Sequence, residues 1–91
     1  MATKRQSSDS VRRALGLQVQ EVRRERGLTQ EGLADKLAML PSNYARIEQG
    51  RQNVTVDTLV KIANGLGVDV ADLFTPPKAR KSRPGRPRKT E

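Results

Sequence analysis

The stretch Thr29–Gly50, TQEGLADKLAMLPSNYARIEQG, decides the fold. Thr29 is a good N-cap for a helix over about residues 30–37, because its side-chain oxygen can accept a hydrogen bond from a free amide of the first turn. Pro41 stands where the next helix takes its first residue, a position at which the missing N–H does no harm. Gly50 ends that helix after about nine residues. Two short helices joined by about three residues predict a helix-turn-helix.

The second of these helices has two different faces. Tyr44 and Ile47 are three residues apart and are expected to point inward. Ser42, Arg46 and Gln49 follow one another at i, i+4 and i+7, which places them on a single exposed stripe. A helix that reads a DNA groove needs such a polar or basic stripe opposite an apolar face.

Upstream of this stretch, apolar residues recur at intervals of four, four and three on one face of a helix. We expect this helix to follow an N-cap at Ser10 and to end at Gly27, and we expect residues 1–9 to form a disordered arm. The inward positions are Val11, Leu15, Val19 and Val22.

Downstream, Thr55 is expected to cap a fourth helix and Asp69 a short last helix over residues 70–74. The inner stripe of the fourth helix consists of Leu59, Ile62, Ala63 and Leu66. No run alternates with the period of two that a strand requires. The sequence therefore predicts an all-α, five-helix domain over residues 10–74.

Composition narrows the possible functions. The chain has 91 residues, of which 34% are hydrophobic and 2% aromatic, and it contains neither Cys nor His. It therefore has no disulfide framework, no thiolate metal site and no histidine as general base or metal ligand. We expect no enzyme, no metal, no cofactor and no small-molecule ligand. No apolar run approaches a membrane span and no secretory signal is visible, so a cytoplasmic protein is expected.

The positive charge is concentrated at the C-terminus. The net charge is +8, yet residues 10–74 contain nine basic and eight acidic side chains, whereas residues 75–91 contain seven basic and one acidic. A basic run of this kind suits a polyanion such as nucleic acid. The alternative is a tail that only improves solubility.

The segment from Leu15 to Phe74 resembles the lambda-repressor/Cro-type (Xre) DNA-binding family. The most specific parts are RGLTQEGLADKL, RIEQG and LVKIANGLGVDVADLF. The resemblance covers about two thirds of the chain. It implies a lambda-repressor-like fold, double-stranded DNA as a partner and a helix over about 41–49 that enters the major groove.

The resemblance also implies roles for single residues. Pro41, Ser42 and Arg46 match positions that contact base edges, and Asn43 is the next candidate, for adenine or phosphate. Arg46 is the strongest candidate for base readout, because a guanidinium can bind guanine O6 and N7 together. As alternatives, Arg46 is a solvated arginine, and Ser42 and Asn43 only stabilise the first helical turn.

The remaining roles concern the DNA backbone and the fold. Gln30 matches a glutamine that touches phosphate and braces the recognition helix. Arg23 and Glu48 match a pair that forms an internal salt bridge, and Tyr44 is expected in the core or, alternatively, with its hydroxyl on a phosphate. The other expected backbone contacts are Gln49, Arg51, Gln52, Asn53 and Thr55.

Three residues depart from the family pattern. Ala38 replaces the glycine often found where a left-handed backbone is wanted. Leu40 replaces the usual Ser or Thr cap, so the cap of the recognition helix is poor. Pro41 offers a base only an apolar contact, for example to a thymine methyl group.

The end of the chain, Ser82–Glu91, reads SRPGRPRKTE and resembles an AT-hook, although Pro84 replaces the arginine that usually precedes the glycine. Such a segment lays arginine in the narrow minor groove of A·T-rich DNA. Three readings stay open: a minor-groove hook, phosphate tracking and an idle, disordered tail. The residues concerned are Lys81, Arg83, Gly85, Arg86, Pro87, Arg88 and Lys89.

These observations predict a sequence-specific transcriptional regulator that binds an inverted repeat as a homodimer. RNA polymerase or a regulatory protein would be further partners, and a membrane would not. The open alternatives are an antitoxin or a restriction–modification controller of the same fold, and an architectural nucleoid protein with little sequence preference.

Overall fold

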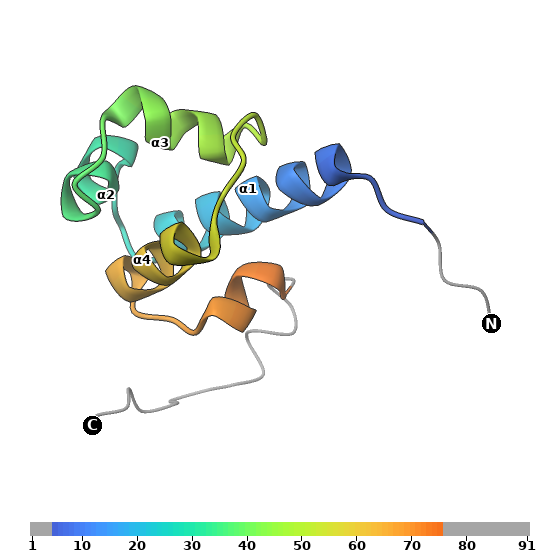
Figure 1. The fold of residues 1–91 in the computed structure, drawn as a ribbon. Helices are drawn as coiled ribbons and strands as arrows, with labels where there is room; N and C mark the ends of the chain where they lie inside the picture. The colour runs from blue at the N-terminus through green and yellow to red at the C-terminus, as the bar shows by residue number, and fades with distance from the viewer. Residues whose placement is uncertain (1–4, 76–91) are drawn as a thin grey trace.

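The computed structural model describes residues 5–75, which form four α-helices and one 3-10 helix (Figure 1). The α-helices are α1 (Ser8–Glu25), α2 (Gln30–Lys36), α3 (Pro41–Glu48) and α4 (Val56–Leu66), and the 3-10 helix is η1 (Val70–Phe74). No strand occurs within residues 5–75, so the all-α prediction is confirmed for this part of the chain. Four of the five predicted helices are α-helices, and the predicted last helix over residues 70–74 is a short 3-10 helix instead.

The first helix begins earlier than its apolar pattern. Its N-cap is Ser7, whose hydroxyl accepts a hydrogen bond from the amide of Ser10 at 3.0 Å. The prediction of a cap at Ser10 is therefore wrong. The first turn is polar and is stabilised by capping and by the Asp9–Arg12 ion pair, so the helix start carries no apolar period that would reveal it.

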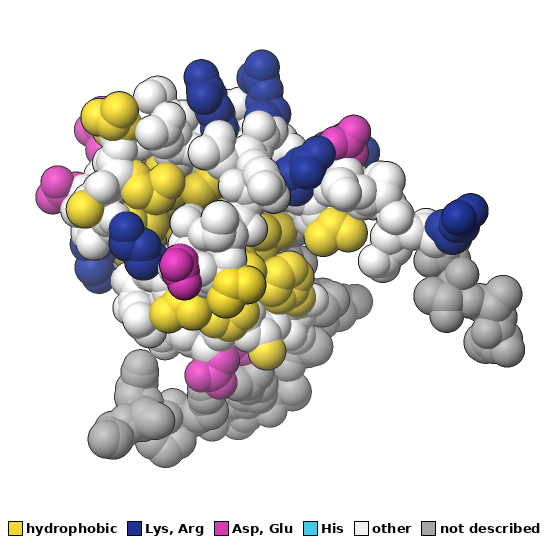
Figure 2. Space-filling view, in the orientation of Figure 1, with side chains coloured by type: hydrophobic (Ala, Val, Ile, Leu, Met, Phe, Trp, Pro, Cys, Tyr) yellow, Lys and Arg dark blue, Asp and Glu magenta, His cyan; other side chains and the backbone are white. Residues whose placement is uncertain are grey.

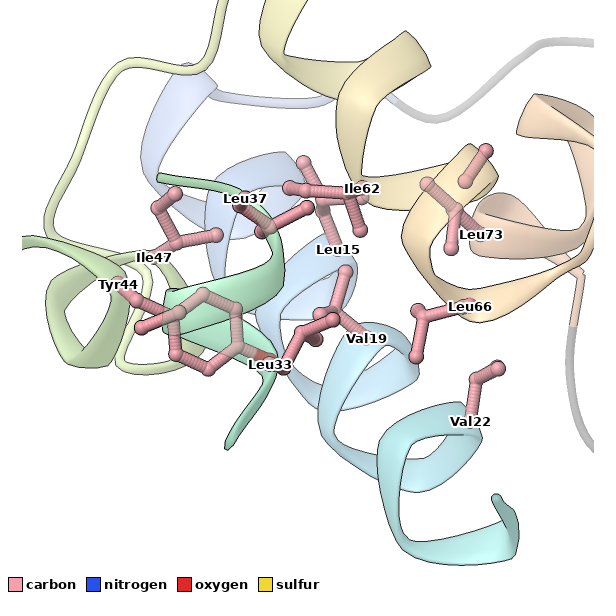
Figure 3. Close-up of a cluster of buried hydrophobic side chains, with 12 residues drawn as sticks. Leu15, Val19, Val22, Leu33, Leu37, Tyr44, Ile47, Ile62, Leu66 and Leu73 are labelled. Atoms are coloured by element: carbon pink, nitrogen blue, oxygen red, sulfur yellow. The ribbon is translucent and has the colours of Figure 1, made fainter. Parts of the chain in front are cut away.

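The core lies between the helices and is almost entirely aliphatic (Figure 3). All four α-helices and η1 contribute to it, and burial of each Leu, Ile or Val side chain contributes about 1.5–3 kcal/mol. Val11, which was expected to point inward, is instead 38% exposed. The buried hydrophobic residues are Leu15, Val19, Val22, Leu33, Ala34, Leu37, Tyr44, Ile47, Ile62, Ala63, Leu66 and Leu73.

The predicted caps of α2 and α4 are present, and the cap of α3 is missing, as its sequence predicts. Thr29 and Thr55 accept hydrogen bonds from the amides of Gly32 and Thr58, at 2.9 and 3.1 Å. Pro41 is the first residue of α3, and Leu40 before it makes no side-chain cap hydrogen bond. Helix α3 thus starts without the capping oxygen that α2 and α4 have.

The turn between α2 and α3 is a Schellman motif built on an alanine. The amide of Ala38 donates to Asp35 O at 3.1 Å, and the amide of Met39 donates to Ala34 O at 2.9 Å. This closure needs a left-handed residue at its centre. Ala38 adopts φ 57°, whereas the equivalent residue after α1 is Gly27, with φ 72°. The turn therefore keeps the geometry expected of a glycine although alanine occupies it.

Candidate nucleic-acid interface

The outer face of α3 presents the predicted stripe to solvent. Ser42, Arg46 and Gln49 are all exposed, and Tyr44 and Ile47 on the opposite face are buried. Figure 2 shows lysine or arginine side chains along the edge that lies over α3 and the segment after it. The structure therefore brings these three side chains together on a basic edge of the molecule.

The N-terminal end of α3 is apolar at its tip. Leu40 is 65% exposed and Pro41 is exposed beside it, whereas Asn43 is half-buried. The amide of Asn43 donates to Leu40 O at 3.0 Å, which closes the first turn. This end of the helix offers a base edge two apolar side chains and the hydroxyl of Ser42.

The residues expected to contact the DNA backbone lie in the irregular loop after α3. Arg51 and Asn53 are exposed and Gln52 is half-buried. Arg51 donates from Nη1 to Gln49 Oε1 at 3.2 Å, so the two side chains lie next to each other. Thr55, by contrast, uses its hydroxyl within the protein: it accepts from the amide of Thr58 and donates to the hydroxyl of Thr58 at 3.0 Å.

The inner end of α3 is fixed by the buried carboxylate of Glu48. Arg23 donates to it from Nε at 2.6 Å and from Nη2 at 3.2 Å, so the ion pair implied by the family resemblance is present. Gln30 donates from Nε2 at 2.8 Å, and Tyr44 donates from its hydroxyl. The carboxylate thus joins α1 and α2 to the last turn of α3 and fixes α3 against the rest of the domain.

This network keeps Glu48 ionised. Burial alone would raise the pKa of Glu48, but the hydrogen bonds from Arg23, Tyr44 and Gln30 outweigh it and lower that pKa. Burial, followed by the hydrogen bond to Glu48, raises the pKa of Tyr44 far above its usual value. The buried phenol donates its hydrogen bond to Glu48 inside the protein, which opposes the alternative that it reaches a phosphate.

Two residues of α1 that contact Glu48 or the end of α3 were not predicted from the sequence. Gln20 donates from Nε2 to Glu48 Oε1 at 3.4 Å, and a Cβ on Gly16 would stand 2.5 Å from the carbonyl oxygens of Ile47 and Glu48. Gly16, Gln20 and Arg23 follow one another at i, i+4 and i+7, so one stripe of α1 faces the end of α3. That spacing was the available signal, but the stripe has no hydrophobic residue to mark it as inward.

A further arginine lies beside the interface without any local signal in the sequence. Arg13 of α1 is exposed, and its Cα and Cγ lie 2.7 Å from the position that a Cβ on Gly50 would take. It therefore stands against the loop that begins with Gly50 and Arg51. Arg13 and Arg51 are far apart in the chain, and only the fold brings them to the same edge.

Two further predictions concern Gln30 and the basic tail. Gln30 is half-buried and directed toward Glu48, so its bracing part is present in the structure. The basic tail residues from Lys81 to Lys89 lie outside the described residues.

Among residues 5–75, no cluster of acidic, Cys or His side chains could hold a metal ion. No helix in the same range is long and apolar enough to cross a membrane.

Comparison with known proteins agrees with this geometry. The family model described as a helix-turn-helix domain matches residues 14–73. The uncharacterized HTH-type transcriptional regulator y4dJ of Sinorhizobium fredii is 38% identical over 66 residues, which are 72% of this chain and 86% of that protein. The control protein C.MunI of a Mycoplasma species is 34% identical over 61 residues, 66% of this chain and 82% of that protein.

A solved structure supports the same relationship. The restriction-modification controller protein C.AhdI from Aeromonas hydrophila superimposes with a TM-score of 0.66 at 31% identity, covering 68% of this chain and 94% of that one. The family match runs from residue 14, within α1, through most of η1 and includes the whole of α3. The chain therefore belongs to the helix-turn-helix family of DNA-binding regulators, of the lambda-repressor/Cro (Xre) type.

Proposed function

We propose that this protein is a transcriptional regulator that recognises a specific DNA sequence by placing α3 in the major groove. The observation that carries the proposal is the exposed stripe of Ser42, Arg46 and Gln49 on a helix whose inner end is fixed by Glu48. A helix that is held rigidly presents its side chains in one geometry, which base readout requires. In this proposal Arg46 binds a guanine edge and Leu40 and Pro41 contact thymine methyl groups.

In this proposal, residues beside α3 bind the DNA phosphates. Arg51 and Asn53 are exposed in the loop after α3, and Arg13 stands beside the same loop. Phosphate contacts of this kind fix the register of the reading helix without choosing a sequence. We assign Thr55 a backbone contact through the amides at the start of α4, because its hydroxyl is used in the cap.

The protein acts in this proposal as a homodimer on an inverted repeat. Two copies related by a two-fold axis present two α3 helices, so the half-site centres should lie about one helical turn apart. The basic tail adds affinity by following phosphates or by entering a minor groove. The function is binding, and no step of it requires catalysis.

Selection of binding sites from random DNA with the full chain tests this proposal. A regulator should enrich one sequence with two-fold symmetry. Sequencing after successive rounds measures the enrichment, and footprinting shows whether both half-sites are covered. Enrichment without any sequence preference would contradict the proposal and would indicate the architectural alternative.

A restriction–modification controller is the second candidate. It is favoured by the similarity to C.MunI and C.AhdI, whose names describe a control protein and a restriction-modification controller. Both candidates predict the same DNA interface. They differ in the location of the selected site, which for a controller would lie upstream of genes for a nuclease and a methyltransferase.

A further inference from the structure

Two exposed apolar side chains stand where α3 begins, on the edge that the proposed function places against DNA. Leu40, the residue before the helix, is 65% exposed, and Pro41, its first residue, is exposed as well. Figure 2 shows hydrophobic side chains over this end of α3, beside the edge that carries the basic side chains. A single exposed leucine is common on protein surfaces, so its meaning depends on the groups around it.

The groups around Leu40 include few hydrogen-bond donors. Pro41 has no N–H, and the amides of Asn43 and Tyr44 both donate to Leu40 O at 3.0 Å. Ser42 is the one residue of this first turn whose amide has no acceptor among residues 5–75. A helix that starts with several free amides suits an anion such as phosphate. Here the side chains that protrude are instead an isopropyl group, a proline ring and one hydroxyl.

The major groove of DNA contains one apolar group that such side chains can recognise. This group is the methyl at C5 of thymine, because the other groups on the base edges are hydrogen-bond donors or acceptors. 5-Methylcytosine carries the same methyl group on the same ring carbon. The two bases differ at C4, where thymine has an acceptor oxygen and cytosine a donor amino group. Leu40 and Pro41 have no side-chain group that could detect this difference.

The nearest polar side chain does not detect it either. The hydroxyl of Ser42, which is exposed, can donate to an oxygen or accept from an amino group. Arg46, which requires an acceptor, lies six residues beyond Leu40, or about 9 Å along a helix. Neighbouring base pairs are only about 3.4 Å apart. The start of α3 and Arg46 therefore contact different base pairs, and the methyl group is read independently of a guanine.

We propose that Leu40 and Pro41 read the C5 methyl group of a pyrimidine, so that 5-methylcytosine is bound in place of thymine and unmethylated cytosine is rejected. The inference rests on the proposed function and names the chemical group that one end of α3 recognises. It also makes DNA binding responsive to methyl transfer. Where a site has cytosine at this position, methylation at C5 supplies the missing contact and tightens binding.

Base analogues that change only the methyl group test the inference on the selected site. Each thymine is replaced in turn by uracil, by cytosine and by 5-methylcytosine, in both half-sites, and fluorescence anisotropy measures the Kd of the full chain. At one position, uracil should weaken binding about fourfold per half-site, the factor expected for one buried methyl group. At the same position, 5-methylcytosine should bind more tightly than cytosine by a similar factor. An unchanged Kd with uracil at every position overturns the inference, and so does equal binding of cytosine and 5-methylcytosine.

The variant Leu40→Ser assigns the methyl effect to this side chain. Serine removes the apolar surface and supplies a capping oxygen, so the variant should stay folded, which thermal unfolding checks. Its Kd values for the thymine and uracil sites should differ by less than about twofold per half-site, because most of the apolar contact is gone. Leu40→Met keeps an apolar side chain and should keep the methyl effect. An equal methyl effect in Leu40→Ser and wild type overturns the assignment.

A matched control makes the same chemical change elsewhere on the surface. Leu17 is 59% exposed on α1, and Leu17→Ser should keep the full ratio between the uracil and thymine sites. Arg46→Ala should also keep this ratio while it loses discrimination at its own base pair. Loss of the methyl effect in Leu17→Ser would overturn the assignment to the start of α3.

The same measurements separate this inference from the proposed function. If the chain enriches no sequence, the proposed function fails and this inference fails with it. If the chain enriches an inverted repeat but binds its thymine and uracil forms equally, the proposed function stands and the inference alone is overturned.

Discussion

Ala38 occupies a backbone position for which alanine is poorly suited. Its φ of 57° is left-handed, where the Cβ approaches the following carbonyl oxygen at a cost of about 1–2 kcal/mol. The Schellman hydrogen bonds around it show that the turn nevertheless closes fully. The rest of the domain therefore imposes this conformation, and part of the stability of the fold is spent on it.

Replacement of Ala38 by glycine should stabilise the protein. Ala38→Gly removes the left-handed penalty at the cost of a more flexible unfolded chain, so we expect a gain of about 1 kcal/mol in the free energy of unfolding. Denaturant unfolding measures it. The matched control is Ala14→Gly at an exposed position inside α1, which should lose about 1 kcal/mol. A loss of stability in both variants would contradict the strained turn.

Glu48 is the second residue whose environment makes a measurable prediction. Its pKa is lowered in the folded protein, so the folded state favours the ionised carboxylate. The stabilisation is fully present above the pKa of the unfolded chain, about 4.3, and is lost as the pH falls through the lower folded value. The loss of unfolding free energy at low pH should therefore depend in part on this side chain.

The variant Glu48→Gln tests this dependence on pH. At neutral pH the variant should be less stable by about 3–5 kcal/mol, since it leaves the buried Arg23 without its counter-charge. Below about pH 4.3 the difference from the wild type should shrink. Free energies of unfolding of both proteins at a series of pH values give this difference directly. The other carboxylates contribute equally to the two proteins, so they do not affect the difference. A difference independent of pH would contradict the ionised network.

At the level of elements, α2 and α3 were predictable because their signals are local. Thr29, Pro41 and Gly50 each act within one turn of the chain, and all three mark the boundaries found in the structure. The polar start of α1 and the 3-10 geometry of η1 lack such signals. Gly16 and Gln20 share one face of α1 by their spacing, but that face has no hydrophobic residue, so its contact with α3 shows only in the packing of distant segments.

Gly16 provides the sharpest test of how α1 supports α3. Inside a helix, glycine to alanine should stabilise by up to about 1 kcal/mol from propensity alone. Here the added Cβ would stand 2.5 Å from two backbone oxygens of α3, and backbone cannot move aside as a side chain can. We therefore expect Gly16→Ala to destabilise by about 1–3 kcal/mol or more.

Gly65→Ala is the comparison for this test, because its Cβ would meet chiefly the flexible ends of Leu37 and Leu33, at 2.9 and 3.3 Å. It should cost less than Gly16→Ala in the same denaturant titration. Gly16→Ala should also weaken DNA binding in excess of its effect on the folded fraction, since α3 must shift. A stabilised Gly16→Ala variant would show that α1 and α3 are not in close contact.

At the scale of the whole molecule, charge and recognition are separated along the chain. Residues 10–74 are nearly neutral, and residues 75–91 hold most of the positive charge. The exposed stripe of α3 was predictable from spacing, and the structure confirms its exposure. The neighbouring Arg13 was not predictable, because it lies in the first helix. Its place at the α3 edge follows only from the packing of α1 against the end of α3.

The tail should dominate the salt dependence of DNA binding. Replacing Arg83, Arg86 and Arg88 by serine in the full chain should reduce the slope of log K against log salt by about three units, roughly one for each lost phosphate contact. The same positions changed to lysine keep the charge and should keep the slope. A loss of A·T preference in the lysine variant would indicate a minor-groove hook. An unchanged slope in the serine variant would mean that the tail is idle.

The central claim is that α3 reads base edges through Arg46. The most direct measurement compares wild type, Arg46→Ala and Arg51→Ala on every single-base variant of the selected site. Arg46→Ala should lose about 1–3 kcal/mol of discrimination at one base pair of each half-site, and Arg51→Ala should weaken all duplexes by the same factor. Equal weakening of all sequences by Arg46→Ala would contradict the claim and reduce Arg46 to a phosphate contact.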